Sequence, residues 1–113
     1  MGRPVLWRWA FAAAVVAVLV MALLPAPPKL PTDPSDKVQH LLAFAVLSLL
    51  ALAAFRQTPW LAIGLGLSAF GGLIELLQLI PPLHRDSDLI DWLVDTGAVA
   101  AVLLGAALSR RRA

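Results

Sequence analysis

The side chains that could do chemistry lie in two parts of the sequence, residues 33–40 and 75–95. Together these parts contain every acidic residue and both histidines: Asp33, Asp36, His40, Glu75, His84, Asp86, Asp88, Asp91 and Asp95. Carboxylates and imidazoles can transfer protons, bind metal ions or hold a polar ligand. Because charged groups near hydrocarbon are costly unless they are paired or placed for a task, this clustering predicts one polar pocket.

In the first part, Asp36 and His40 are four residues apart and share one face of a predicted helix. A carboxylate bound to one imidazole nitrogen would fix the tautomer and leave the other nitrogen to act as a base or ligand. The alternative is that Asp36 caps the helix and His40 faces water at a membrane interface.

A stripe of small and polar residues leads into the second part, at spacings of four, three, four and three: Gly64, Ser68, Gly71, Glu75 and Gln78. Such spacing puts them on one helix face, where small residues allow a neighbouring helix to approach. The stripe therefore predicts that Glu75 and Gln78 face the bundle interior, with Glu75 about 7 Å inside the helix end. An interhelical hydrogen bond is the structural alternative to a functional site.

Three further carboxylates, Asp88, Asp91 and Asp95, follow at helical spacing on one face. They repel one another unless a cation, Arg85 or His40 lies between them. Asp88 could simply favour a helix N-terminus. Asp95 is predicted to lie about as deep as Glu75, which makes it harder to explain as a surface acid.

Four apolar stretches must position these residues, and each has about the 20 residues that cross a bilayer as a helix. They are Val5–Leu24, Val38–Phe55, Trp60–Ile80 and Leu89–Leu108. Their short connections, including a tight turn at 56–59, make successive helices antiparallel neighbours. A row of small residues at 97, 101 and 105 predicts a close-packed face on the last helix. The predicted fold is an all-α membrane protein, a four-transmembrane-helix antiparallel bundle forming a single domain over 1–113.

Composition supports this class and excludes others. Of the 113 residues, 60% are hydrophobic and only 14% charged, more apolar than a soluble domain of this size. The sparse basic residues exclude nucleic-acid binding, and the absence of cysteine excludes disulfides and thiolate catalysis. The lipid bilayer is the expected partner, and no cofactor is predicted.

The distribution of basic residues predicts the orientation. Six arginines lie at one end of the bundle (Arg3, Arg8, Arg56, Arg110, Arg111 and Arg112), and three basic residues lie at the other (Lys29, Lys37 and Arg85). Both termini are therefore expected in the cytoplasm, with the polar pocket on the outer face. A cleaved signal peptide over the first stretch is the alternative, but Leu24-Pro25-Ala26 is a poor cleavage site.

Three blocks of this sequence resemble the VanZ-like family of small bacterial integral membrane proteins. They are Asp36-Lys37-Val38-Gln39-His40-Leu41-Leu42-Ala43-Phe44, then Glu75-Leu76-Leu77-Gln78, then Arg85-Asp86-Ser87-Asp88 leading to Asp91, Asp95 and Gly97. The resemblance covers about residues 36–105. This chain departs from the family pattern at Asp95, where asparagine is usual, and in the extra acids Asp86 and Asp88.

The resemblance implies a multi-pass protein of the bacterial cytoplasmic (inner) membrane, linked through the family's namesake to low-level resistance to the glycopeptide antibiotic teicoplanin. The resemblance implies no particular biochemical activity. It does transfer a set of site residues. The candidates for catalysis are His40, Glu75 and Asp91, and those for binding are Asp36, Lys37, Gln78, Arg85 and Asp95.

We predict that the outer pocket engages a lipid-linked or headgroup-bearing component of the cell envelope. His40 would accept a proton or bind the ligand, Glu75 would be a buried acid or base, and Lys37 with Arg85 would hold an anionic group such as phosphate. Whether the pocket also catalyses a reaction is left open.

Three other functions stay open. A metal-dependent membrane enzyme could use His40, Glu75, Asp91 and Asp95 as ligands, although the sequence has no dense metal motif and no metal site is assigned. A proton-coupled permease would need a homo-oligomer, since four helices leave little room for an internal path. The polar cluster could also only fix helix packing, in a structural or interaction subunit of an envelope complex.

Overall fold

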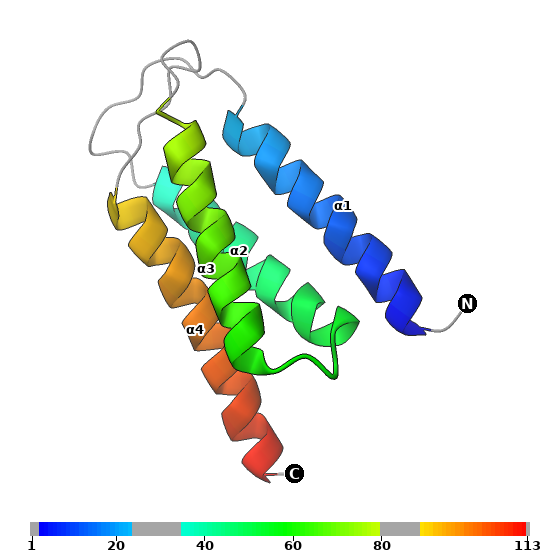
Figure 1. Ribbon diagram of the computed structural model, residues 1–113. Helices are drawn as coiled ribbons and strands as arrows, with labels where there is room; N and C mark the ends of the chain where they lie inside the picture. Colours follow the sequence, from blue (N-terminus) through cyan, green and yellow to red (C-terminus); the bar gives the residue numbers. More distant parts are fainter. Residues whose placement is uncertain (1–2, 24–34, 80–88, 113) are drawn as a thin grey trace.

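The computed structural model describes residues 3–23, 35–79 and 89–112, with side chains described over 5–23, 38–79 and 89–109. It contains four helices, α1 (Arg3–Leu23), α2 (Ser35–Ala54), α3 (Trp60–Leu77) and α4 (Leu89–Arg112), as Figure 1 shows. No strand occurs in these ranges. The prediction of an all-helical fold is confirmed.

The starts of α3 and α4 coincide with the predicted starts, and the other helix ends differ from the predicted ends by one to four residues. α2 begins earlier, at Ser35, so Asp36 and Lys37 belong to its first turn, and α4 continues beyond Leu108 to Arg112. Apolar windows mark the part of a helix that suits hydrocarbon, whereas polar residues continue the helix beyond it. α3 instead ends early, at Leu77, and the predicted end at Ile80 lies outside the described residues.

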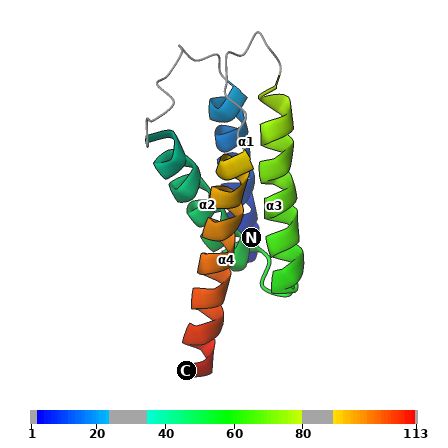
Figure 2. The ribbon, with the colours of Figure 1, turned by 90° about the vertical axis from the view of Figure 1, so that its left-hand side faces the viewer.

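The helix α2 lies at the centre of the fold. It packs against α1, α3 and α4, and α3 packs along α4, whereas α1 makes only a limited contact with α3. α3 and α4 run in opposite directions side by side, and α2 is inclined to both (Figures 1 and 2). The polar side chains of the three helices α2, α3 and α4 can therefore meet.

The buried apolar core comes from the same three helices. Its members are Phe44, Leu47 and Ala51 from α2, Ile63, Leu67 and Ile74 from α3, and Ala98 and Val99 from α4. Helix α1 adds only partly buried residues to this core, among them Phe11, whose ring meets that of Phe55 edge to face at 5.4 Å. The core thus holds α2, α3 and α4 in a fixed arrangement around the polar residues.

Much of the apolar surface lies outside this core. Large hydrophobic side chains are exposed on all four helices, for example Met21, Leu49, Leu61 and Leu104. Three segments are long and apolar enough to cross a membrane: Val5–Leu23, Trp60–Leu77 and Leu89–Ser109. The apolar part of α2, Val38–Ala54, is shorter. The described residues therefore suit a membrane protein with three candidate spans and a shorter fourth apolar helix, and the crossing of the membrane by all four helices stays a prediction.

The turn between α2 and α3 is fixed by backbone and side-chain contacts. The Thr58 N–H donates to the Phe55 carbonyl at 3.1 Å, confirming the predicted tight turn at 56–59. Arg8 Nε of α1 donates to the Ala54 carbonyl at 3.1 Å, and its guanidinium lies 5.3 Å from the centre of the Phe55 ring. A cation at the C-terminal end of a helix is favourable, so Arg8 secures α1 to α2 at this end.

Candidate functional site

The interface between α3 and α4 brings polar groups into the bundle. Trp92 Nε1 donates to the Ser68 carbonyl at 3.0 Å, and the hydroxyls of Ser68 and Thr96 are 2.9 Å apart. Gly71 lies in close contact with α4, because a Cβ there would be 3.2 Å from Asp95 Oδ2. The lack of a side chain at Gly71 therefore gives the Asp95 carboxylate its place against α3.

The predicted stripe on α3 faces the other helices. Gly71, Glu75 and Gln78 are buried, while Gly64 and Ser68 are half-buried. Gln78 Nε2 donates to the carbonyl of Ala22 in α1 at 3.0 Å, and Gln78 Oε1 is buried and accepts no hydrogen bond from the described residues. The prediction that this face points inward is confirmed.

His40 of α2 is bound to Asp95 of α4. Its Nδ1 lies 2.9 Å from Asp95 Oδ1, the Asp95 side chain is fully buried, and that of His40 is only 12% exposed. A carboxylate on one ring nitrogen fixes the orientation of the imidazole. The sequence suggested Asp36 for this role, and the Asp36 side chain lies outside the described residues.

Glu75 of α3 completes a cluster with this pair. His40, Glu75 and Asp95 each present one nitrogen or oxygen, and these three atoms lie within 4.8 Å of one another. Glu75 is 7% exposed. We call these residues the triad. Three helices thus bring one imidazole and two carboxylates together, a set that can transfer a proton or coordinate a cation.

The other predicted site residues are placed only in part. Asp91 is buried one turn before Asp95, but it is not among the three groups that come within 4.8 Å. Asp36 and Lys37 lie in the first turn of α2, with side chains outside the description, and Arg85 lies wholly outside it. The structure therefore brings together three of the eight candidates, with Gln78 one turn from Glu75 on the same face.

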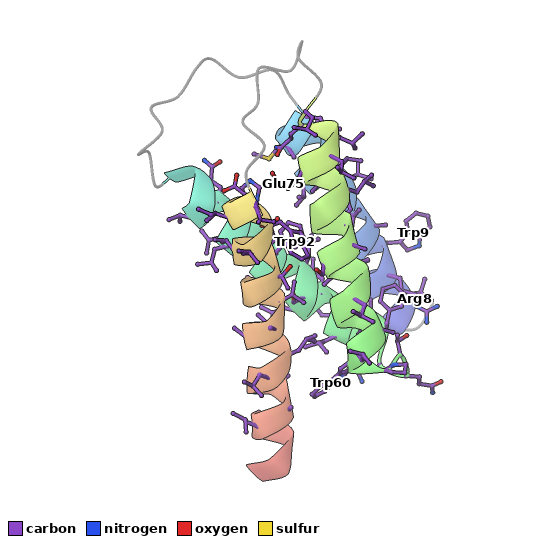
Figure 3. All side chains as sticks on the ribbon, turned by 60° about the vertical axis from the view of Figure 1, so that its left-hand side comes forward. Arg8, Trp9, Trp60, Glu75 and Trp92 are labelled. Carbon is purple, nitrogen blue, oxygen red and sulfur yellow. The ribbon has the colours of Figure 1, made fainter. Side chains whose placement is uncertain are left out.

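A groove that the sequence did not indicate runs beside the triad. It has a volume of about 580 Å³ and is lined by Ala69, Gly72, Leu73, Glu75, Leu76, Leu89 and Trp92. Among the described residues that line it, Glu75 is the only charged one, and Figure 3 shows Glu75 and Trp92 in the same half of the bundle. The groove lies on the outer side of the α3–α4 interface, where Leu73, Leu76 and Leu89 are exposed. Glu75 is therefore shared between this groove and the triad.

A second cavity lies in the opposite half of the fold. It has a volume of about 470 Å³ and is lined by Phe11, Val15, Ala51, Phe55, Thr58, Ala62, Ile63, Gly66, Leu67 and Phe70. None of these side chains titrates or binds metal ions. Of these two cavities, the groove at Glu75 is thus the better candidate for a site.

No protein-family model, curated protein or solved structure matches this chain. The function of this chain is therefore inferred from the chain's own residues.

Proposed function

We propose that this chain is an integral membrane protein that binds an amphiphilic component of the bacterial cell envelope, with its apolar chain in the α3–α4 groove and its polar group at the triad. One observation carries the proposal: Glu75 lines the groove and also belongs to the triad. A ligand lying along Leu73 and Leu76 would therefore meet a carboxylate and an imidazole at one end of the apolar groove.

Membrane placement supports the proposal. The exposed apolar residues on every helix, and the three segments long enough to span, need a lipid environment to cover them. We place both termini in the cytoplasm and the triad towards the outer side of the bacterial inner membrane, following the excess of arginine at the other end. Trp60 lies in the half opposite to Glu75 (Figure 3), and Arg8 contacts Ala54 near the same end, as expected for residues at a membrane interface.

The chemistry of the site suits a headgroup that both donates hydrogen bonds and carries phosphate. Glu75, His40 and Asp95 can accept hydrogen bonds from hydroxyl or amide groups. Lys37 and Arg85 would hold the phosphate, as the sequence predicts. Lipid-linked saccharides of the envelope combine these features, and the resemblance to VanZ-like proteins supports an envelope role.

The experiment is lipid capture by the purified chain. The protein is extracted from bacterial membranes in mild detergent, and bound lipids are identified by native mass spectrometry. Leu76→Trp would fill the groove, whereas Leu65→Trp makes the same exchange at an exposed position of α3 outside it. We expect a phosphate-bearing lipid to be retained by the wild type and by Leu65→Trp, and to be lost from Leu76→Trp.

Glu75→Gln tests the polar end of the groove separately. It keeps the size of the side chain and removes its charge, so the retained fraction of that lipid should fall while nonspecific phospholipid stays unchanged. Equal retention by all four proteins would mean that the groove is not a binding site. Helical content from circular dichroism confirms that the variants are folded.

A further inference from the structure

We infer that the triad of His40, Glu75 and Asp95 is a binding site for one divalent transition-metal ion. The inference does not depend on the lipid ligand proposed above. It starts from the donors: one imidazole nitrogen and two carboxylate oxygens, from three different helices, lie within 4.8 Å of one another. Such mixed donor sets occur in zinc sites that keep an open coordination position.

The distances between the three ligand atoms suit an ion after small side-chain movements. Zinc binds nitrogen and oxygen at about 2.0–2.2 Å, so two ligands at tetrahedral angles are about 3.4 Å apart. His40 Nδ1 and Asp95 Oδ1 are 2.9 Å apart, close to that separation. Two ligand atoms of the triad that are as much as 4.8 Å apart would have to approach each other by about 1.4 Å, which small side-chain rotations supply.

The imidazole offers two ways of binding. Either Nδ1 exchanges its hydrogen bond with Asp95 for a bond to the ion, or Asp95 keeps that bond and Nε2 becomes the ligand. In the second case Asp95 holds the imidazole in place, an arrangement common for metal-binding histidines. In both cases Asp95→Asn weakens binding, and Glu75 is a direct ligand.

Charge also favours an ion. Asp95 is fully buried and Glu75 nearly so, and a buried carboxylate is costly without a nearby positive charge. Within the triad His40 offsets at most one negative charge, whereas a divalent ion offsets two. Imidazole with carboxylate favours zinc, iron or manganese over magnesium and calcium, which prefer oxygen donors alone.

An ion can reach the site from outside, and an uncharged oxygen that could bind it lies beside the triad. His40 retains some exposure, and Glu75 also lines the groove, so an ion can reach the triad. Gln78 Oε1 lies one turn from Glu75, buried and without a hydrogen bond from the described residues. When His40, Glu75 and Asp95 all bind the ion, one coordination position stays open for water or for a molecule in the groove.

The test uses the full-length, untagged protein in detergent, stripped with a chelator and then titrated with Zn²⁺ and Co²⁺. We expect one ion per chain by mass spectrometry, and the intense visible absorption of four- or five-coordinate Co²⁺. Absence of stoichiometric binding by the wild type, or a spectrum typical of hydrated Co²⁺, would overturn the inference whether or not any variant folds. Because no lipid is added, the outcome is independent of the lipid-capture experiment.

Variants then locate the ion. Glu75→Gln and Asp95→Asn should each weaken Zn²⁺ binding at least about 100-fold, the upper end of the loss seen when only an outer-shell partner is removed. Asp88→Asn removes the same charge from a carboxylate that the sequence assigns to a helix N-terminus, and His84→Gln removes the other histidine of the chain. Both controls should bind as the wild type does. Undiminished binding in Glu75→Gln, or loss in either control, would place the ion elsewhere.

Discussion

Replacing Gly71 by alanine should destabilise the fold, because this glycine sets the spacing of three helices. An added Cβ would lie 3.2 Å from Asp95 Oδ2, 3.4 Å from Asp95 Cβ and 3.4 Å from Phe44 Cζ. Asp95 and Phe44 are both fully or almost fully buried and belong to α4 and α2. Neither can turn away into solvent, so the helices must separate by a few tenths of an ångström.

Neighbouring glycines of α3 supply matched controls. A Cβ at Gly66 meets nothing within 4 Å, and one at Gly72 meets Trp92 Nε1 at an ordinary 3.5 Å. Overpacking a well-packed interior costs about 1–3 kcal/mol, whereas alanine gains up to about 1 kcal/mol over glycine in helix propensity. The propensity gain is common to all three substitutions. Gly71→Ala should therefore be less stable than Gly66→Ala by about 1–3 kcal/mol.

Equilibrium unfolding in mixed micelles, with rising mole fraction of a denaturing detergent, measures this difference by circular dichroism. The expected order of stability is Gly66→Ala, then Gly72→Ala, then Gly71→Ala. If Gly71→Ala were as stable as Gly66→Ala, the close approach of α3 to Asp95 would be wrong, and with it the geometry of the triad.

Two further substitutions test contacts away from the triad. Trp92→Phe removes the hydrogen bond to the Ser68 carbonyl and should lower the free energy of unfolding by about 0.5–1 kcal/mol. Trp9→Phe makes the same exchange at an exposed position and should leave the free energy of unfolding unchanged in the same assay. Arg8→Lys keeps the charge but loses the Nε donor to Ala54 and the planar contact with Phe55, so it should destabilise the fold by up to about 1 kcal/mol. The same change at the exposed Arg56 should have no effect, and equal stability of both lysine variants would remove the role assigned to Arg8.

The inward face of α3 could be predicted because it is a local property of one helix. Residues spaced three and four apart share a face whatever surrounds the helix, and small residues next to a carboxyl indicate a face covered by protein. Gly71, Glu75 and Gln78 are buried as that reasoning requires. The depth of Asp95 followed from the same helical spacing, and it too is buried.

Contacts between helices could not be predicted in the same way. The sequence offered His40 two kinds of partner: Asp36, whose side chain lies outside the described residues, and the three carboxylates of the last helix, without saying which one. The structure shows Asp95, fifty-five residues along the chain. The small residues at 97, 101 and 105 predicted a packed face, but all three are exposed, with no atom within 4 Å of a Cβ at Gly97 or Gly105. The spacing of residues in the sequence indicates which of them share a helix face. It does not indicate which faces contact each other, because those contacts depend on how α2 crosses α3 and α4.

The short apolar part of α2 connects the membrane to the position of the triad. The segment Val38–Ala54 falls below the length of the other three segments, and at 1.5 Å per residue it covers about 26 Å of a hydrocarbon layer about 30 Å thick. Because α2 is inclined to its neighbours (Figure 1), it reaches less far still along the membrane normal. His40 is the third residue of this segment, so it would lie near the level where hydrocarbon gives way to water and headgroups. A layer that thins there to match α2 would bring headgroups to Glu75 from the groove side, where the fold leaves an opening rather than a packed helix. With the membrane placement proposed above, the short apolar part of α2 would therefore give the buried acids access to polar ligands and ions.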